Sequence, residues 1–330
     1  MNLDFHTLDR DLTIARMNHY GSNRVPFFFM ISYDTTKSVL VPRDTPNEMG
    51  IEFSFPNTRT EAHFLPSHTS TALTINPPSE KIYEYQFNQV RQELQNGNIY
   101  LLNLTQPTHI KTQAGLLDIY IQARAKYKVY FPDHFVVFSP ETFVRIQGDK
   151  IFTYPMKGTI RADILHAREI LDHSPKEQAE HASVVDLLRN DLGQIAQSVR
   201  VNRYRYFEKV RAGTHDLWQV SSEIEGILPG NFHTSLGDLV FRLLPAGSIT
   251  GVPKKNAVDI IRRVENYDRG FYTGICGYFD GQNLDSSVMI RFIEQTPHGL
   301  VYKSGGGIHQ MSDMDSEFDE LIQKIYVPVD

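Results

Sequence analysis

In the segment Tyr154-Pro155-Met156-Lys157-Gly158-Thr159, a lysine stands between a proline and a glycine. Pro155 fixes one backbone angle and removes a hydrogen-bond donor, so the chain is expected to leave a strand here in a defined direction. Gly158 has no Cβ and allows the backbone to approach a ligand closely. Lys157 is therefore either an exposed lysine in a strand-to-loop turn, as most lysines are, or an amine that reaches a buried site.

The pattern around this segment predicts many strands with interspersed helices. A hairpin is expected where Thr142–Ile146 and Lys150–Tyr154 alternate around Gly148-Asp149. Further strands are predicted at 25–33, 99–105, 135–138, 199–210, 274–280, 287–293 and 301–305, and helices at 83–95, 116–125, 174–189, 236–243, 254–265 and 313–325. Residues 1–50 are predicted as strands and turns, and residues 41–80 as loops with short strands. This order predicts an α+β fold with antiparallel sheets.

Composition excludes several classes of protein. The chain has 330 residues, of which 41% are hydrophobic and 22% charged, which is typical of a soluble globular protein. The net charge is −6 and no basic run of five residues occurs, so neither nucleic acid nor an anionic membrane is an expected partner. No apolar run approaches the roughly 20 residues that span a bilayer.

The single cysteine, Cys276, excludes an internal disulfide and a cysteine-rich metal cluster. Its setting in an apolar stretch predicts a small core residue. The acidic N-terminus has no hydrophobic signal region. These features together predict a cytoplasmic protein in a reducing compartment.

Two pairs of carboxylates have helical spacing. Glu177 and Glu180 are three residues apart, as are Glu317 and Glu320, so each pair lies on one helix face. Four such oxygen donors suit Mg2+. The spacings have ordinary explanations too, since Glu177 completes a capping box with the residue at position 174 and Glu320 can pair with the lysine four residues on.

The glycine run 305–307 and Arg291 are harder to interpret from local pattern. The glycines are followed by no Gly-Lys-Ser/Thr and lack GxGxxG spacing, which counts against a phosphate-binding kinase-like enzyme. They are expected to break the preceding strand, either as a tight turn or with N–H groups aimed at an anion. Arg291 lies in an otherwise apolar predicted strand, so a carboxylate of the protein or of a ligand is expected beside it.

Taken together, the motifs resemble those of the chorismate-utilising enzymes. The resemblance runs from about residue 83 to residue 324 and is carried by SPETF, PMKGT, KEQAEH, VVDLLRND, PAGSITGVPKKNA, RGFYTGICGYF, VMIRF, SGGGI and SEFDELIQK. It implies a four-layer α/β/β/α sandwich of two large, mostly antiparallel sheets flanked by helices. It also implies a chorismate-binding catalytic domain over residues 81–330, with a shortened N-terminal part, residues 1–80, packed on the same core.

Within this family, the residue before Gly-Thr separates the activities. Anthranilate synthases resemble PIAGT there, whereas aminodeoxychorismate synthases resemble PIKGT, and this chain has Lys157 in PMKGT. Met156 replaces the usual isoleucine, and Gln219 stands where anthranilate synthases have a histidine. The resemblance therefore favours aminodeoxychorismate synthase component I. It does not extend to a tryptophan pocket, because no LLES-like segment is present.

The resemblance also implies roles for individual residues. Lys157 would be the nucleophile, and Glu141 the general acid for the departing 4-hydroxyl of chorismate. Glu180 and Glu320 would bind Mg2+ directly, with Glu177 and Glu317 behind its waters. The substrate-binding residues implied are Gly158, Thr159, Ser248, Tyr272, Arg291, Gly306, Gly307 and Lys324.

The implied reaction converts chorismate and ammonia to 4-amino-4-deoxychorismate, on the route to 4-aminobenzoate and folate. Cys276 has no histidine-paired setting, so the ammonia is expected from a separate glutamine amidotransferase subunit. The alternatives are anthranilate, isochorismate or salicylate synthesis within the same family, and a non-catalytic chorismate-binding subunit.

Overall fold

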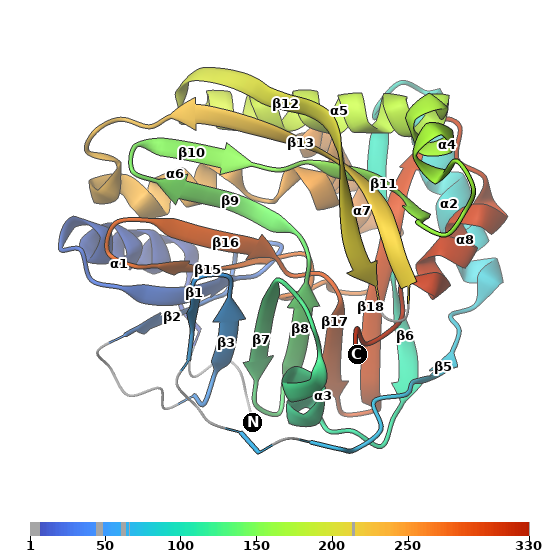
Figure 1. Cartoon of the computed structure of the whole chain (residues 1–330), viewed down its shortest axis with the longest axis horizontal. Coiled ribbons are helices and arrows are strands. Elements are labelled where there is room, and N and C mark those ends of the chain that lie inside the picture. The colour runs from blue at the N-terminus through green and yellow to red at the C-terminus, as the bar shows by residue number, and fades with distance from the viewer. Residues whose placement is uncertain (1–6, 44–48, 61–63, 66, 213–214, 330) are drawn as a thin grey trace. The chain divides into compact units, whose positions relative to one another are not determined.

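The computed structural model describes residues 7–43, 49–60, 64–65, 67–212 and 215–329 (Figure 1). Contacts within the chain define two compact units, each made of three segments. The first unit comprises Met1–Asn47, Glu141–Ser248 and Arg269–Val288, and the second comprises Glu48–Pro140, Ile249–Asp268 and Met289–Asp330. Each unit is built on its own large sheet.

The first unit contains a nine-stranded antiparallel sheet, ordered β11-β13-β10-β9-β16-β15-β1-β2, with β12 paired to β13. Its strands are β1 (Phe27–Ile31), β2 (Ser38–Pro42), β9 (Thr142–Gln147), β10 (Lys150–Thr153), β11 (Met156–Arg161), β12 (Gln197–Ala212), β13 (His215–Ile227), β15 (Ile275–Phe279) and β16 (Leu284–Val288). The expected β9–β10 hairpin is confirmed.

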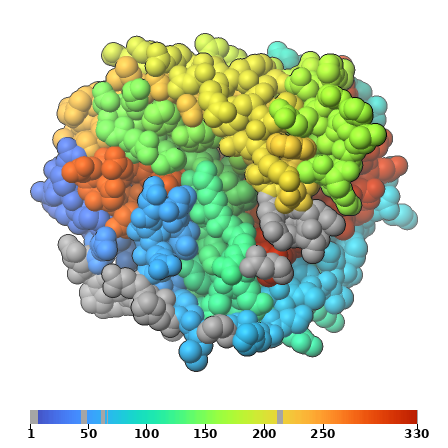
Figure 2. Space-filling view, in the orientation of Figure 1, coloured from blue at the N-terminus to red at the C-terminus, as the bar shows by residue number. Residues whose placement is uncertain are grey.

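The described residues of this unit form the α-helices α1 (Arg10–Ser22), α4 (Ala167–His173), α5 (Pro175–Gly193) and α6 (Leu236–Leu243), with a short 3-10 turn at Phe232–Ser235. Helix α5 begins as its sequence predicts, with Ser174 as N-cap and proline at the first helical position. It packs along β11, β12 and β13. The guanidinium of Arg168 on α4 lies 4.8 Å from the Phe207 ring and 5.0 Å from the Trp218 ring, which fixes α4 on the β12–β13 ribbon. This ribbon, in yellow, is exposed on the face shown in Figure 2.

The second unit contains another nine-stranded antiparallel sheet, ordered β14-β6-β18-β17-β8-β7-β3-β4, with β5 paired to β6. Its strands are β3 (Glu52–Phe55), β4 (Thr58–Arg59), β5 (Thr74–Asn76), β6 (Leu101–Lys111), β7 (Tyr127–Phe131), β8 (Phe135–Ser139), β14 (Gly251–Val252), β17 (Phe292–Thr296) and β18 (Gly299–His309). The prediction of short strands among the loops of residues 41–80 is confirmed.

Helices α2 (Glu80–Gln95), α3 (Leu116–Gln122), α7 (Lys254–Val264) and α8 (Met314–Gln323) pack on this second sheet. Helix α3 contributes Ile119 to a buried cluster that also includes Phe138 and Tyr302. Burying such apolar side chains is the main favourable contribution to folding. The expectation of two large antiparallel sheets flanked by helices is thus confirmed. No helix among the described residues is long and apolar enough to cross a membrane.

Helix α1 contradicts the prediction of strands and turns for residues 1–50 over Arg10–Ser22, whereas β1 and β2 confirm it farther along, and residues 1–6 and 44–48 lie outside the described residues. Its buried residues are Thr13, Met17 and Gly21, of which only one is a large apolar residue. An apolar stripe of the usual kind is therefore absent from this helix. At Gly21, an added Cβ would lie 2.2 Å from the His233 carbonyl oxygen, so backbone packing takes the place of the stripe.

The strand predicted over residues 287–293 is also wrong, because the chain leaves extended conformation there. Strand β16 ends at Val288 and β17 begins at Phe292. Arg291, between them, has φ of 54°, in the left-handed region that a regular strand does not adopt.

The N-terminal eighty residues supply strands to both sheets, β1 and β2 to the first and β3 to β5 to the second. The proposed division at residue 80 stays a prediction, as does the assignment of residues 81–330 to one catalytic domain. The two units defined by contacts within the chain are each made of three separate segments, which alternate along the sequence.

Replacing the N-cap of α8 tests how this helix is held. The Asp313 carboxylate accepts hydrogen bonds from the backbone N–H of Ser316 at 3.1 Å and from its hydroxyl at 2.9 Å. Asp313→Ala should lower the free energy of unfolding by about 1 kcal/mol in urea titrations. The control Asp319→Ala, at an exposed position in the same helix, should change it by less than about 0.5 kcal/mol. Equal losses in the two variants would contradict a capping role.

Candidate active site

Lys157 and Gly158 lie in a bulge of strand β11. Met156 pairs with Ser221 on β13 and Thr159 pairs with Gln219, so two residues of β11 face one residue of β13. The strand before Pro155 ends as predicted, since β10 stops at Thr153, but the alternative of a strand-to-loop turn is wrong, because β11 begins at Met156 and continues as a bulged strand. A bulge bends its strand and re-aims the side chains beside it.

The glycine in this bulge is required by its surroundings. Gly158 has φ of +86°, which residues with a side chain rarely adopt. An added Cβ would lie 2.8 Å from Glu177 Oε2 and 3.0 Å from Leu171 Cδ1. Helices α4 and α5 therefore approach the strand closely here because no side chain separates them from it.

Lys157 is a partly buried amine beside a carboxylate. Its Nζ lies 2.9 Å from Glu180 Oε1, with side-chain exposures of 16% and 10%. The interpretation of Lys157 as an ordinary solvent-exposed lysine is therefore wrong. Glu177 lies against Gly158, so both predicted carboxylates of α5 face the PMKGT segment. The backbone N–H of Glu177 also donates to the Ser174 hydroxyl at 3.4 Å, which is one half of the capping box.

The predicted general acid and one predicted substrate-binding residue are in direct contact. The Ser248 hydroxyl makes a short hydrogen bond to Glu141 Oε1. The Glu141 backbone oxygen accepts from the Ser287 hydroxyl at 2.8 Å and from the Val288 N–H at 3.2 Å. Glu141 is therefore held by both its main chain and its side chain. Of the other predicted residues in this unit, Tyr272 is buried just before β15 and Thr159 is exposed on β11.

In the second unit, the glycine run lies within a strand rather than ending one. Gly305, Gly306 and Gly307 continue β18 and pair with Thr105, Leu104 and Asn103 of β6. The expected strand break is therefore wrong. An added Cβ on Gly306 would lie 3.4 Å from Glu317 Oε2 and 3.8 Å from Glu320 Oε1. The glycines allow the acidic face of α8 to approach the strand.

A lysine again accompanies this acidic pair. Lys324 Nζ lies 2.6 Å from Glu320 Oε1 and donates to the Gly305 carbonyl at 2.8 Å. The i,i+4 ion pair expected from the sequence is therefore present. Glu317 is 3% exposed and accepts a hydrogen bond from the Ser312 hydroxyl at 2.7 Å. Predicted residues Gly306, Glu317, Glu320 and Lys324 are thus brought together.

Arg291 precedes β17 and reaches the end of α8. Its Nη1 donates to the Lys324 carbonyl at 3.3 Å, and its guanidinium carbon lies 5.1 Å from the centre of the Tyr326 ring. The positive charge of the Arg291 guanidinium is therefore stabilised by a carbonyl oxygen and by the face of an aromatic ring. The expectation that Arg291 lies inside a strand is wrong, but its nearness to Lys324 agrees with the predicted grouping.

Tyr83, on α2, was not predicted as a site residue. Its hydroxyl is buried and has no hydrogen-bond partner among the described residues. Burial raises the pKa of Tyr83 well above its usual range, and the charges of Glu317 and Glu320 raise it further. The sequence shows only an aromatic residue on the apolar face of a helix, which does not distinguish Tyr83 from a core residue.

His181, directly after Glu180, was also assigned no role from the sequence. It is fully buried, and its Nε2 lies 2.7 Å from the Ser222 hydroxyl on β13. Burial lowers the pKa of His181 to about 4, Arg205 acts in the same direction, and a hydrogen bond with the Lys157 backbone opposes them. The imidazole is therefore neutral at pH 7.

Cys276 is a buried core residue on β15, as its sequence predicts. Burial raises the pKa of its thiol far above the usual range, so the reactive thiolate is disfavoured.

The acidic residues fit a divalent cation in their chemistry. Within the described part of the chain, no three His, Cys, Asp or Glu side chains are arranged to hold a metal ion. In each pair one carboxylate already contacts a positive charge of the protein, because the Lys157 ammonium lies beside Glu180 and the Lys324 ammonium lies beside Glu320. Their all-oxygen donor set suits Mg2+.

Comparisons with known proteins identify the family of the chain. The family described as chorismate binding enzyme matches residues 11–330. An uncharacterized PabA-like protein of Pasteurella multocida is 46% identical, covering 96% of this chain and 98% of its own length. Aminodeoxychorismate synthase component 1 of Klebsiella aerogenes is 33% identical over 75% of this chain and 57% of its own length. The menaquinone-specific isochorismate synthase of Escherichia coli has the same fold, with a TM-score of 0.73, 17% identity and coverage of 95% of this chain and 80% of that one. The chain therefore belongs to the chorismate binding enzyme family.

Proposed function

We propose that the protein is an aminodeoxychorismate synthase component I, which converts chorismate and ammonia to 4-amino-4-deoxychorismate through a covalent bond to Lys157. The observation that carries this proposal is the position of the Lys157 amine, partly buried on a glycine-dependent bulge and 2.9 Å from Glu180. A non-catalytic subunit that only bound chorismate would not require a lysine amine at this position. The 33% identical relative with that name supports the same reaction.

The proposed covalent step begins at C2 of chorismate. The lone pair of Lys157 Nζ bonds to C2 while both ring double bonds shift, from C1–C2 to C1–C6 and from C5–C6 to C4–C5, and the bond from C4 to its hydroxyl oxygen breaks. Glu141 gives a proton to that oxygen, which leaves as water. The Ser248 hydroxyl, which contacts Glu141, orients this carboxyl group.

Ammonia then bonds to C4, both ring double bonds shift back, and Lys157 leaves C2 as a free amine. The ammonium formed at C4 returns one proton to Glu141, so lysine and glutamate end as they began. The net change is the replacement of the hydroxyl by an amino group, with release of water. Two easier displacements replace one difficult one, which is the usual gain from a covalent nucleophile.

Mg2+ is the cofactor that the acidic pairs would hold. We propose Glu180 and Glu320 as direct ligands, with Glu177 and Glu317 binding its waters. When bound, the ion would neutralise the ring carboxylate of chorismate. Arg291 and Tyr272 would bind the enolpyruvyl carboxylate with the help of the backbone of Gly306 and Gly307. The anion site would be completed by Gly158, Thr159, Ser248 and Lys324.

The ion pair of Lys157 must open before the chemistry. An ammonium has no lone pair, and the Glu180 carboxylate stabilises the charged form of the lysine. Lys157 therefore has to lose both its proton and its partner to become a nucleophile. A cation on Glu180 would remove that partner, which links cofactor binding to release of the amine.

The source of ammonia is proposed to be a separate glutamine amidotransferase subunit. The one cysteine is buried and its thiolate is disfavoured, so it does not supply a glutaminase nucleophile. The purified chain should therefore use ammonium salts but not glutamine.

Product analysis tests the proposal directly. The purified chain, with chorismate, Mg2+ and an ammonium salt, should yield a product with the mass of 4-amino-4-deoxychorismate, and glutamine in place of ammonium should yield none. Anthranilate, isochorismate or salicylate in the chromatogram would identify another activity of the family. Calorimetric binding of chorismate without any product would indicate a non-catalytic subunit.

The variant Lys157→Ala tests the covalent step. Removing the nucleophile should lower kcat by at least about 1000-fold, measured as 4-amino-4-deoxychorismate formed per enzyme. The control Lys209→Ala, which removes a lysine paired with Asp216 on the exposed ribbon, should retain activity. Circular dichroism should show that both variants are folded. Undiminished turnover by Lys157→Ala would end the covalent mechanism.

The variant Lys157→Met tests the competition for Glu180. Without its ammonium partner the carboxylate should bind Mn2+ about fivefold to tenfold more tightly, as measured by electron paramagnetic resonance. Lys150→Met is the matched control, because it removes the same charge from an ion pair with Glu225 at 3.5 Å. Its Mn2+ affinity should change much less. Equal or weaker Mn2+ binding by Lys157→Met would show that Lys157 and the cation do not share this carboxylate.

A further inference from the structure

Gln219 on β13 lies opposite the bulge of β11. Its backbone pairs with Thr159, on one side of the bulge. Its side-chain amide nitrogen donates to Met156 Sδ at 2.9 Å, on the other side, and to the Ser221 hydroxyl at 3.2 Å. An amide nitrogen carries two N–H donors, so both acceptors are bound at once. One residue, 8% exposed, thus contacts both ends of the bulge.

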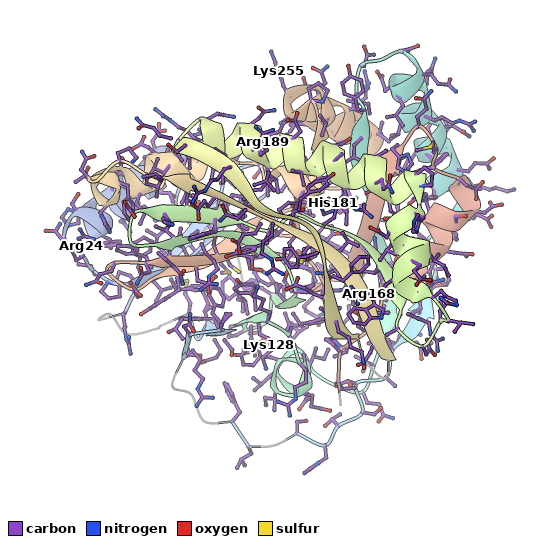
Figure 3. All side chains as sticks on the ribbon, turned by 45° about the horizontal axis from the view of Figure 1, so that its top comes forward. Arg24, Lys128, Arg168, His181, Arg189 and Lys255 are labelled. Atoms are coloured by element: carbon purple, nitrogen blue, oxygen red, sulfur yellow. The ribbon has the colours of Figure 1, made fainter. Side chains whose placement is uncertain are left out.

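The Gln219 amide lies on the face of β13 that is turned away from the helices. Figure 3 labels Arg168 on α4 and His181 on α5, beside the β12–β13 ribbon. The Arg168 guanidinium lies 5.0 Å from the Trp218 ring. His181 Nε2 lies 2.7 Å from the Ser222 hydroxyl. Since successive side chains of a strand point to opposite faces, Trp218 and Ser222 face the helices and Gln219 points away from them.

The two neighbouring side chains at the bulge therefore have partners on opposite faces of the sheet. Lys157 meets Glu180 of α5 at 2.9 Å, on the helix side. Met156, one residue earlier, contacts Gln219 on the other side. The alternation along β11 thus directs Met156 away from α5 and Lys157 toward it.

The backbone ladder does not by itself fix which residue of β11 is the extra one. The register with β13 is interrupted between Met156 and Thr159, so the residues between them have no paired position. Moving the extra residue by one position would turn the Lys157 side chain to the opposite face, away from Glu180. A side-chain contact that holds Met156 in place opposes this shift.

We propose that Gln219 is a positioning residue, whose amide holds Met156 on the face away from α5 and thereby keeps the Lys157 amine directed toward Glu180 and the substrate. The proposal rests on the proposed function in taking Lys157 as the reacting group. Gln219 acts through Met156 and not by contact with a reacting atom. Its effect is expected in kcat rather than in KM, because a misdirected amine leaves chorismate binding in place.

Two substitutions break the same contact from its two ends. Gln219→Met keeps the length of the side chain and removes both N–H donors, so kcat should fall about 30-fold, with KM for chorismate within about threefold, measured as chorismate consumed with ammonium and Mg2+. Met156→Leu removes the sulfur acceptor and should lower kcat about tenfold. The double variant should lose no more than Gln219→Met alone, since residues in one contact are not additive.

A matched control separates loss of stability from loss of direction. Gln219→Met also removes a hydrogen-bond partner from the fully buried Ser221 hydroxyl, so it should lower the thermal unfolding midpoint. Gln86→Met removes another buried glutamine, whose amide donates to the Val264 carbonyl at 3.0 Å in the second unit. This control should lower the midpoint as well and leave kcat unchanged.

Chemical labelling reports the direction of the lysine without any turnover. Acetylation of Lys157 by an N-hydroxysuccinimide ester, followed by mass spectrometry, should be about fivefold faster in Gln219→Met than in the native protein, because the amine leaves its partly buried position beside Glu180. Amide hydrogen exchange of residues 154–161 should also be faster in this variant. Gln86→Met should match the native protein in both measurements.

Several outcomes would overturn the proposal. Native kcat in Gln219→Met would do so, as would a double variant whose loss equals the product of the two single losses. Unchanged labelling of Lys157 in Gln219→Met would show that the amide does not direct the lysine. An equal loss of kcat in Gln86→Met would leave Gln219 with only a structural role. The proposed function fails separately, through full activity of Lys157→Ala, and the labelling experiment still shows whether Gln219 holds the lysine in place.

Discussion

The close approach of helix α5 to strand β11 is the contact on which the candidate site depends. It places Glu180 at 2.9 Å from Lys157 and Glu177 against Gly158. The approach is possible because the bulge contains a glycine at φ of +86°, where a Cβ would overlap a carboxylate. The positions of Lys157, Glu177 and Glu180 on these two elements thus depend on one missing side chain.

The second unit uses the same arrangement with different elements. Helix α8 approaches β18 at Gly306, and Glu317 and Glu320 lie where a side chain would otherwise be. Lys324 pairs with Glu320 as Lys157 pairs with Glu180. In each unit an acidic pair is therefore held beside glycine backbone and is partly neutralised by an ammonium. For Glu180, whose side chain is 10% exposed, this pairing offsets the cost of burying a charge.

The two sequence departures near the nucleophile are in contact with each other. The Gln219 amide donates to the Met156 sulfur at 2.9 Å and to the Ser221 hydroxyl at 3.2 Å. Both Met156 and Gln219 flank the bulge that carries Lys157. These two departures from the family's usual residues therefore flank the backbone of the proposed nucleophile.

Local pattern was sufficient for much of the fold, whereas the candidate site residues were named by the family resemblance. The N-cap Ser174, the hairpin at Gly148 and helix α6 follow from short-range capping, turn and periodicity rules, and these elements appear as expected. The motifs identified Lys157 and the acidic pairs. Only the tertiary structure showed the bulge in β11, the continuation of β18 through its glycines, the left-handed Arg291, the buried hydroxyl of Tyr83 and the contact between Gln219 and Met156. Each of these depends on which distant segment packs against the residue, and neighbours in sequence contain no information about that contact.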